Sequence, residues 1–419
     1  MLKIHTFDHN HSPLILHLPN EKNNEIEASH LMALPALIDP HVHFRTPGDE
    51  HKENWISAAR AAISGGVSTV FDMPNTSPST TTYERLIEKK QLIETQLNET
   101  KIPLRYHLYF GAHKDCLSEL EKVKDHVIGI KIYMGSSTGS LLVDDPLFLD
   151  ELFAAATELD MLIGVHAENE SIIKQRQRRF NGIKTPHIHS KIRDRSAAIS
   201  STEQALLLAK KYGTRLGIMH MSTKEELALV KELKKEKVPV FAEVAPHHLF
   251  LHGNAYDTWG TLVQMNPPLR EQEDCQALWK GIQEGSIDTI GTDHAPHTIE
   301  EKKASYGNAP SGVPGIETYL PLFLNAVNKG HLEINRLIEL THENINRIYK
   351  LEAHQDWVLV NLHKQKKVNA KQFNSKCKWS PFDGISLKGW PEFVVLKNKI
   401  YPCLEDSSLY KESVSKISS

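Results

Sequence analysis

The sequence has few cysteines, no long apolar run and little net charge, and each of these absences excludes a class of protein. Its four cysteines lie far apart and form no CxxC pair, which argues against a disulfide framework and a zinc ribbon. No apolar stretch approaches the roughly 18 residues that a membrane span needs. The first ten residues, MLKIHTFDHN, lack the basic flank and apolar stretch of a secretory signal. We therefore expect a cytoplasmic protein that does not enter a membrane.

The charge balance gives no reason to expect nucleic acid as a partner, because the formal net charge is −3 and the pI is about 6.8. A length of 419 residues with 40% hydrophobic residues allows a large core, so no disulfide is needed for stability. Histidine, in contrast, is abundant, with 24 residues. Histidine is the commonest metal ligand and a frequent acid–base group. A small-molecule substrate and a histidine-rich site are therefore the first expectation.

A strand–loop–helix pattern repeats from about residue 34 to residue 330. Short β-branched runs alternate with segments whose apolar residues recur at helical spacing, which predicts a parallel sheet. A closed (β/α)₈ TIM barrel is the natural solution at this length, and an open doubly wound sheet is the alternative. The predicted strands are Leu34–Phe44, Val67–Asn75, Ile102–Ala112, Val127–Met134, Met161–Glu168, Arg215–Ser222, Val238–His248 and Ser286–His297. The clearest predicted helices are Glu53–Ser64, Thr82–Leu97, Pro146–Leu159, Thr202–Tyr212 and Lys224–Lys235.

The two chain ends do not follow this pattern. Short strand-like runs such as Pro13–Leu18 and Phe393–Leu396 stand among turn signals that are typical of β-hairpins. We expect the ends to pair in a small β-sandwich beside the barrel. The predicted division is a barrel domain over residues 36–354 and a composite β-domain over residues 1–35 and 355–419.

The first candidate ligands are His41 and His43, in the segment DPHVHFR at the end of a predicted strand. Alternate residues of a strand point to the same face, so both imidazoles converge on one place and could hold one metal ion. A pair of strand histidines packed in the core is the ordinary alternative. The position of the pair at the start of a barrel favours the metal.

Three further groups that can bind a metal, Lys131, His166 and His220, each end a different apolar strand. A single histidine that closes a strand is usually structural. A structural role is harder to accept for three consecutive strands that all end in such a group. The carboxyl ends of barrel strands meet at the face where active sites lie.

Asp293, in GTDHAPH at the end of the last predicted strand, is the natural carboxylate of this site. The spacing suggests one metal held by His41, His43 and Asp293, and another held by His166 and His220. Two metals about 3.5–4 Å apart need a bridging ligand. Lys131 can be this bridging ligand only if its amine is neutral or has reacted with CO₂ to form an anionic carbamate, because an ammonium group cannot coordinate a metal. The alternative is a buried Lys131 paired with Asp293 and no metal.

Taken together, these motifs resemble the dihydroorotase branch of the amidohydrolase superfamily, over roughly residues 35 to 320 and again near residues 375–389. The resemblance is strongest for the variants with a carboxylated lysine, since Lys131 precedes MGSSTG. The sequence departs from the family at two places. Thr46 stands where the family often has Glu, and the loop Thr298–Pro314, the candidate lid over the substrate, differs from that of some relatives. The segments that carry the resemblance are DPHVHFR, FDMPNT, GIKIYMGSSTG, GVHAEN, GIMHMS, EVAPHHL, MNPPLR and GTDHAPH.

The resemblance implies two divalent metal ions, most simply Zn²⁺, although Mn²⁺ or Co²⁺ would fit the same donors. It implies that Arg45, Asn75 and His297 hold a substrate carboxylate and that Asn266 contacts the pyrimidine ring. A guanidinium at the mouth of the site also suits bidentate capture of a carboxylate. The metal ligands that it implies are His41, His43, the carboxylated Lys131, His166, His220 and Asp293, which is also the general base.

The implied reaction is the reversible cyclisation of N-carbamoyl-L-aspartate to dihydroorotate, a step of pyrimidine (UMP) biosynthesis. In the hydrolytic direction, a hydroxide that bridges the metals would attack the ring amide, and Asp293 would carry the proton. An allantoinase or hydantoinase would share the ligands and differ in the substrate pocket. A non-catalytic dihydroorotase-like subunit is the third hypothesis, and it predicts lost ligands. We expect a homodimer, which could associate with aspartate transcarbamoylase.

Overall fold

Eight parallel strands form a barrel. The structure, a computed structural model, describes residues 1–19, 24–137 and 141–403. The strands follow one another in sequence order around the sheet. An isolated parallel bridge between Val42 and His294 joins the first strand to the segment after the last, and the His43 amide donates to the His294 carbonyl at 2.8 Å. The predicted TIM barrel is confirmed. Its strands are β4 (Leu37–Val42), β5 (Val67–Asp72), β6 (Arg105–Gly111), β7 (Gly129–Tyr133), β8 (Ile163–His166), β9 (Leu216–Ile218), β10 (Val240–Val244) and β11 (Thr289–Ile290).

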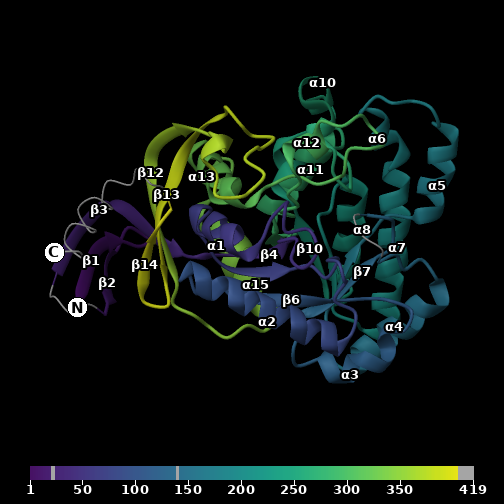
Figure 1. Ribbon diagram of the computed structural model, residues 1–419, viewed down its shortest axis with the longest axis horizontal. Helices are drawn as coiled ribbons and strands as arrows, with labels where there is room; N and C mark the ends of the chain where they lie inside the picture. The colour runs from purple at the N-terminus through teal and green to yellow at the C-terminus, as the bar shows by residue number, and fades with distance from the viewer. Residues whose placement is uncertain (20–23, 138–140, 404–419) are drawn as a thin grey trace.

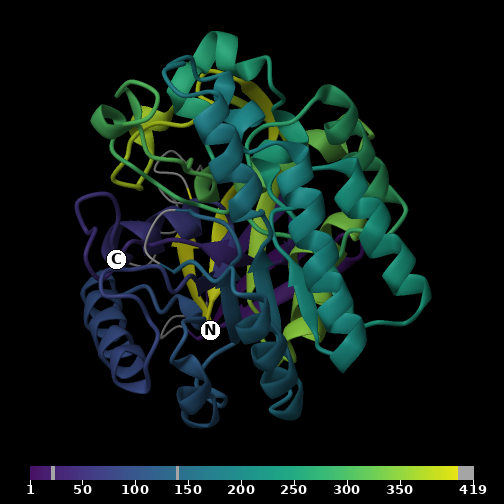
Figure 2. The same ribbon diagram turned by 90° about the vertical axis from the view of Figure 1, so that its right-hand side faces the viewer.

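Helices pack around the outside of the barrel strands (Figure 2). Strands β4, β5, β7 and β8 are buried at every position, as a parallel sheet covered on both faces requires. Among the described residues, no helix combines the length and the apolar character of a membrane span. The helices are α1 (Trp55–Ser64), α2 (Tyr83–Thr100), α3 (Leu120–Val123), α4 (Pro146–Glu158), α5 (Glu170–Arg179), α6 (Ile188–Ile192), α7 (Arg195–Tyr212), α8 (Lys224–Lys235), α9 (Pro246–Phe250), α10 (Ala255–Trp259), α11 (Gln272–Gln283), α12 (Ile299–Lys302), α13 (Tyr319–Asn328), α14 (Ile334–Ile338) and α15 (Asn344–Tyr349).

Helix boundaries agree with the sequence where a capping residue precedes the helix. Helix α8 begins after Thr223, whose side chain accepts from the Glu226 amide in a capping box. Helix α7 is longer than predicted, because Asp194 caps it and Thr202 lies inside it, donating to Glu226. The predicted strand that ran to His248 ends at Val244, since α9 starts there with a proline, whose fixed φ suits the first position of a helix.

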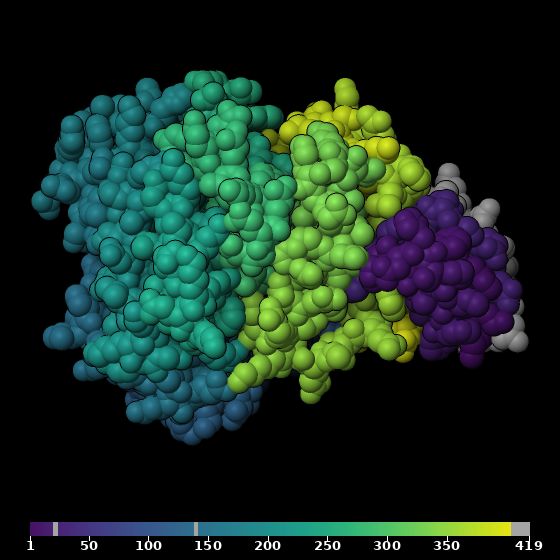
Figure 3. Space-filling view, turned by 180° about the vertical axis from the view of Figure 1, so that it is seen from behind, coloured from purple at the N-terminus to yellow at the C-terminus, as the bar shows by residue number. Residues whose placement is uncertain are grey.

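The chain ends pair with each other, as predicted, in one six-stranded mixed sheet. Strand β12 pairs with β3 antiparallel, and β3 pairs with β1 parallel. Figures 1 and 3 show the first strands beside the last ones at one end of the molecule. Residues 20–23 and 404–419 of the predicted β-domain lie outside the described residues. The strands are β1 (Leu2–Phe7), β2 (Pro13–Leu18), β3 (Asn24–Pro35), β12 (Trp357–Lys367), β13 (Ser386–Leu396) and β14 (Lys399–Pro402).

Candidate metal centre

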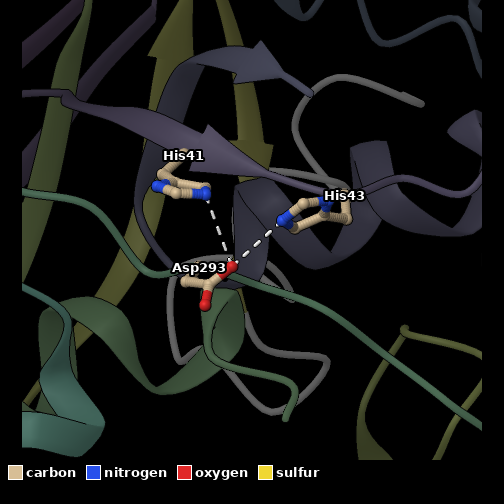
Figure 4. Close-up of side chains that lie close together, drawn as sticks. All are labelled: His41, His43 and Asp293. Carbon is tan, nitrogen blue, oxygen red and sulfur yellow. Dashed lines mark hydrogen bonds and ion pairs between the residues drawn. The ribbon is translucent and has the colours of Figure 1, made fainter. Parts of the chain in front are cut away.

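His41, His43 and Asp293 converge at the carboxyl ends of the barrel strands (Figure 4). They offer one ligand atom each, and these atoms all lie within 4.8 Å of one another. Nε2 of His43 lies 3.0 Å from Asp293 Oδ1, and Nε2 of His41 lies 3.4 Å from the same oxygen. All three side chains are buried. The first predicted ligand set is therefore brought together.

The other ring nitrogen of each histidine is held by an acceptor. Nδ1 of His41 lies 2.8 Å from the Glu243 carboxylate, and Nδ1 of His43 lies 2.8 Å from the Asn75 side-chain oxygen. These oxygens accept, so each Nδ1 carries the proton and each Nε2 keeps a lone pair. Burial lowers the pKa of His43 to about 4, which keeps that ring neutral.

Both Nε2 lone pairs therefore face a carboxylate oxygen with no proton between them. Two neutral imidazole nitrogens and one carboxylate oxygen are the donors that a zinc-type cation prefers. The residues present thus fit a divalent cation.

The second pair, His166 and His220, comes from β8 and the turn after β9. Nδ1 of His166 lies 3.1 Å from Nε2 of His220. Nε2 of His166 lies 3.0 Å from the buried Glu168 carboxylate, which accepts its proton and leaves Nδ1 with the lone pair. The ring of His220 also lies 5.2 Å from that of His41, measured between centroids. The two predicted ligand pairs are neighbours in one site.

Behind His166, Glu168 also accepts from Arg193, whose guanidinium nitrogen lies 2.6 Å away. Burial opposes ionisation of Glu168, but Arg193 and His166 outweigh it and hold its pKa below the usual range. The supporting roles of Glu168, Arg193 and Glu243 were not predicted from the sequence. A signal was present in each case, since Glu168 follows His166 by two residues in GVHAEN and Glu243 is the charged residue of the buried strand β10.

Lys131 lies in β7 and is 1% exposed. Burial lowers its pKa to about 8, with Glu243 and Asp293 acting in the opposite direction. Its Nζ lies 2.9 Å from Met219 Sδ, and among the described residues it forms no ion pair with Asp293. The alternative of a simple lysine–aspartate pair is therefore not what this site contains. Thr138 and Gly139 of the MGSSTG segment lie outside the described residues.

A cavity opens above these ligands. The predicted substrate residues Arg45, Asn75 and Asn266 line it, whereas His297 lies behind Arg45, with its Nε2 3.1 Å from the guanidinium. Nε2 of His189 holds the Asn266 side-chain oxygen at 2.9 Å. The lining residues are His41, His43, Arg45, Asn75, Tyr133, Ser137, His166, His220, Asn266, Asp293, Ala295, Ser311 and Gly312.

The backbone is constrained at three residues of the site. Arg45, His220 and Asp293 have φ values of 63°, 37° and 47°, in the left-handed region that non-glycine residues seldom adopt. Such conformations persist only where the surrounding structure enforces them, and they cluster at functional sites. Gly291 provides room nearby, since a Cβ there would lie 2.8 Å from both the Glu243 carboxylate and the His41 Cβ.

Comparison with known proteins agrees with this geometry. The amidohydrolase family model matches residues 32–355. A dihydroorotase of Methanosarcina mazei is 34% identical over 90% of this chain and 84% of its own length, and one of Bacillus licheniformis is 34% identical over 90% and 88%. Among solved structures, an L-hydantoinase (dihydropyrimidinase) of Arthrobacter aurescens superposes with a TM-score of 0.88 at 26% identity, covering 95% of each chain. The chain therefore belongs to the amidohydrolase family, in which it is a relative of the dihydroorotases.

Proposed function

We propose that this chain is a dihydroorotase, which opens the cyclic amide of dihydroorotate and, in reverse, closes N-carbamoyl-L-aspartate. One observation carries the choice of substrate. Arg45 is 4% exposed and lines the cavity, and among the described residues it has no carboxylate as an ion-pair partner. A buried guanidinium with no carboxylate in contact is costly, and an anionic substrate reduces that cost.

The guanidinium of Arg45 is oriented for this task. Its Nε donates to the Pro296 carbonyl at 3.1 Å, and its NH2 group contacts His297. These contacts fix the plane of the guanidinium, which can then bind a carboxylate through two parallel hydrogen bonds. A hydantoin needs no carboxylate, so a buried guanidinium with no carboxylate in contact favours dihydroorotate over the hydantoinase alternative.

We propose that this site holds two divalent cations, most simply Zn²⁺, and that a carbamate on Lys131 would be one of their ligands. The neutral donors of His41 and His43 support the first, and the facing nitrogens of His166 and His220 support the second. The buried lysine supports the carbamate, because a lowered pKa increases the fraction of neutral amine that can react with CO₂. When bound, such cations polarise the amide carbonyl and lower the pKa of water.

Asp293 is the proposed general base. Its Oδ1 faces His41 and His43, and a carboxylate is ionised in the neutral range and so can accept a proton. In the hydrolytic direction the carboxylate takes the proton of the attacking water and returns it to the leaving ring nitrogen. Arg45 meanwhile holds the substrate carboxylate, so that the amide lies over the metal ligands.

The test is to measure turnover of dihydroorotate, a 5-substituted hydantoin and allantoin by wild type, Arg45→Gln and the exposed control Arg60→Gln. We expect wild type to turn over dihydroorotate preferentially. The loss of one buried bidentate contact predicts a fall in kcat/KM of at least about 100-fold in Arg45→Gln. Turnover of hydantoin or allantoin without dihydroorotate would replace this proposal by the alternative. A protein with no bound metal and no turnover of any amide would favour the non-catalytic subunit.

We further propose a cytoplasmic homodimer, able to associate with aspartate transcarbamoylase. The four free, buried cysteines support a reducing compartment, and two-fold dimers are the commonest soluble assemblies. In it, residues 36–354 would form the catalytic domain and the chain ends the accompanying β-domain. Light scattering of the protein alone and with the transcarbamoylase tests both associations, and a monomer that gains no mass would contradict them.

A further inference from the structure

Tyr133 buries a hydroxyl that has no hydrogen-bond partner among the described residues. Its side chain lines the catalytic cavity, and the residue is 4% exposed. Buried tyrosine hydroxyls usually find a partner, because an unpaired buried polar group is unfavourable. Elsewhere in the fold Tyr109 and Tyr349 pair their hydroxyls at 2.8 Å.

The position of Tyr133 shows which part of the cavity its hydroxyl serves. Tyr133 ends β7, two residues after Lys131, so both side chains point into the barrel. The Lys131 Nζ lies 5.1 Å from the centroid of its ring, and the His166 ring lies 6.0 Å from it. Arg45 follows β4, which lies three strands away in the sheet. Tyr133 thus borders the metal ligands, and it lines the same cavity as Arg45, whose charge acts on its hydroxyl.

We propose that the Tyr133 hydroxyl donates a hydrogen bond to the carbonyl oxygen of the amide that is opened. This inference rests on the proposed cyclic-amide reaction. With the substrate carboxylate at Arg45, the amide lies over the metal ligands, where Tyr133 offers a neutral O–H donor. Negative charge develops on the amide oxygen as water adds to the carbon, so a fixed donor there binds the transition state more strongly than the substrate.

A packing role makes a different prediction. The ring of Tyr133 lies beside Lys131 Nζ and the His166 ring, and phenylalanine would keep both contacts. Only the hydroxyl distinguishes the two roles, so Tyr133→Phe is the decisive variant. Tyr349→Phe is the control, because it removes a tyrosine hydroxyl at the end of α15 that pairs with Tyr109 and lies outside the catalytic cavity.

The experiment is steady-state kinetics of wild type, Tyr133→Phe and Tyr349→Phe on dihydroorotate, with metal content and circular dichroism recorded for each. We expect kcat of Tyr133→Phe to fall by about 10²- to 10³-fold, the usual loss of one oxyanion donor, with KM, metal content and fold unchanged. Tyr349→Phe should keep the wild-type kcat.

Two results would overturn the assignment. A kcat of Tyr133→Phe within twofold of wild type would show that the hydroxyl does not act in the transition state. A rise in KM alone would place its contact in the ground state, for instance at the substrate carboxylate. If wild type opens another cyclic amide instead of dihydroorotate, the proposed substrate fails, and the same comparison on that amide still tests Tyr133. If wild type opens no cyclic amide, both proposals fail.

Discussion

The Glu243 carboxylate lies 2.8 Å from Nδ1 of His41, and this contact turns Nε2 of the same ring toward Asp293. Glu243 comes from β10 and His41 from β4, strands that lie six positions apart in the sheet order. The barrel closes between its first and last strands and so brings both side chains into its interior. A buried carboxylate that orients a metal-binding imidazole is a common support of metal sites.

Replacing this support should weaken metal binding. In Glu243→Gln the anionic acceptor of the His41 proton is lost, so the ring is less basic and less well oriented. We expect metal affinity to fall about 10- to 100-fold, as is usual for such supporting residues. Competition with a chromogenic chelator measures the affinity directly. The exposed Glu300→Gln serves as the control, and equal affinities in the two variants would contradict the role of Glu243.

Lys131 should carry a carbamate that forms with CO₂. Its burial and lowered pKa favour the neutral amine that reacts. Protein prepared with ¹³C-bicarbonate and metal should show a carbamate carbon signal in nuclear magnetic resonance. The signal should vanish in Lys131→Met, together with most of the bound metal. A wild-type protein that holds its metals with no such signal would disprove the carbamate.

The buried pair of Lys89 and Asp72 should make a large contribution to stability. Lys89 Nζ lies 2.6 Å from Asp72, whose other oxygen accepts from the Phe44 amide at 2.8 Å. Lys89→Met leaves the carboxylate buried without its cation, and we expect the free energy of unfolding to fall by about 3–5 kcal/mol. Urea denaturation measures it. The exposed Lys122→Met should change it by no more than about 1 kcal/mol, and a similarly small change in Lys89→Met would refute the prediction.

Lys302 should make stability depend on pH. Its buried amine donates to the carbonyls of Gln264 and Pro310, and burial, aided by Arg45, lowers its pKa from 10.5 to about 7. Between pH 7 and 10.5 the unfolded chain therefore binds more protons at this lysine than the folded chain does. Stability should rise with pH over that window, by up to about 1.4 kcal/mol per pH unit.

Lys302→Met should lack this rise, so the difference in unfolding free energy between wild type and variant should shift in favour of wild type as pH increases. Denaturant titrations at several pH values measure it, with the exposed Lys303→Met as the control. Parallel curves for wild type and Lys302→Met would show that Lys302 keeps its ordinary pKa.

Much of the site could be predicted because its residues stand at strand ends. His41, His43, His166 and His220 follow apolar runs, and barrel geometry alone brings such ends together. The supports were not predictable in the same way. Glu243 and Glu168 act only through contacts between strands, and their importance follows from which ring nitrogen they hold.

Two predicted boundaries of secondary-structure elements were wrong, and each error has a local cause. The predicted strand through His248 ends early because Pro246 starts a helix, and α7 begins at Arg195 because Asp194 caps it. Apolar periodicity does not indicate either event. The unpaired hydroxyl of Tyr133 also needed the structure, since the sequence shows only a tyrosine two residues after Lys131.

The most direct test of the account measures metal content by elemental analysis and dihydroorotate turnover by ultraviolet absorbance, on wild type and Asp293→Ala. Asp293 faces His41 and His43, and it is also the proposed base. We predict two divalent metals per wild-type chain, measurable turnover, and at least about a 10³-fold loss in the variant, which lacks both a ligand and the proton carrier. A wild-type protein with neither bound metal nor turnover, or an Asp293→Ala variant as active as wild type, would contradict the account.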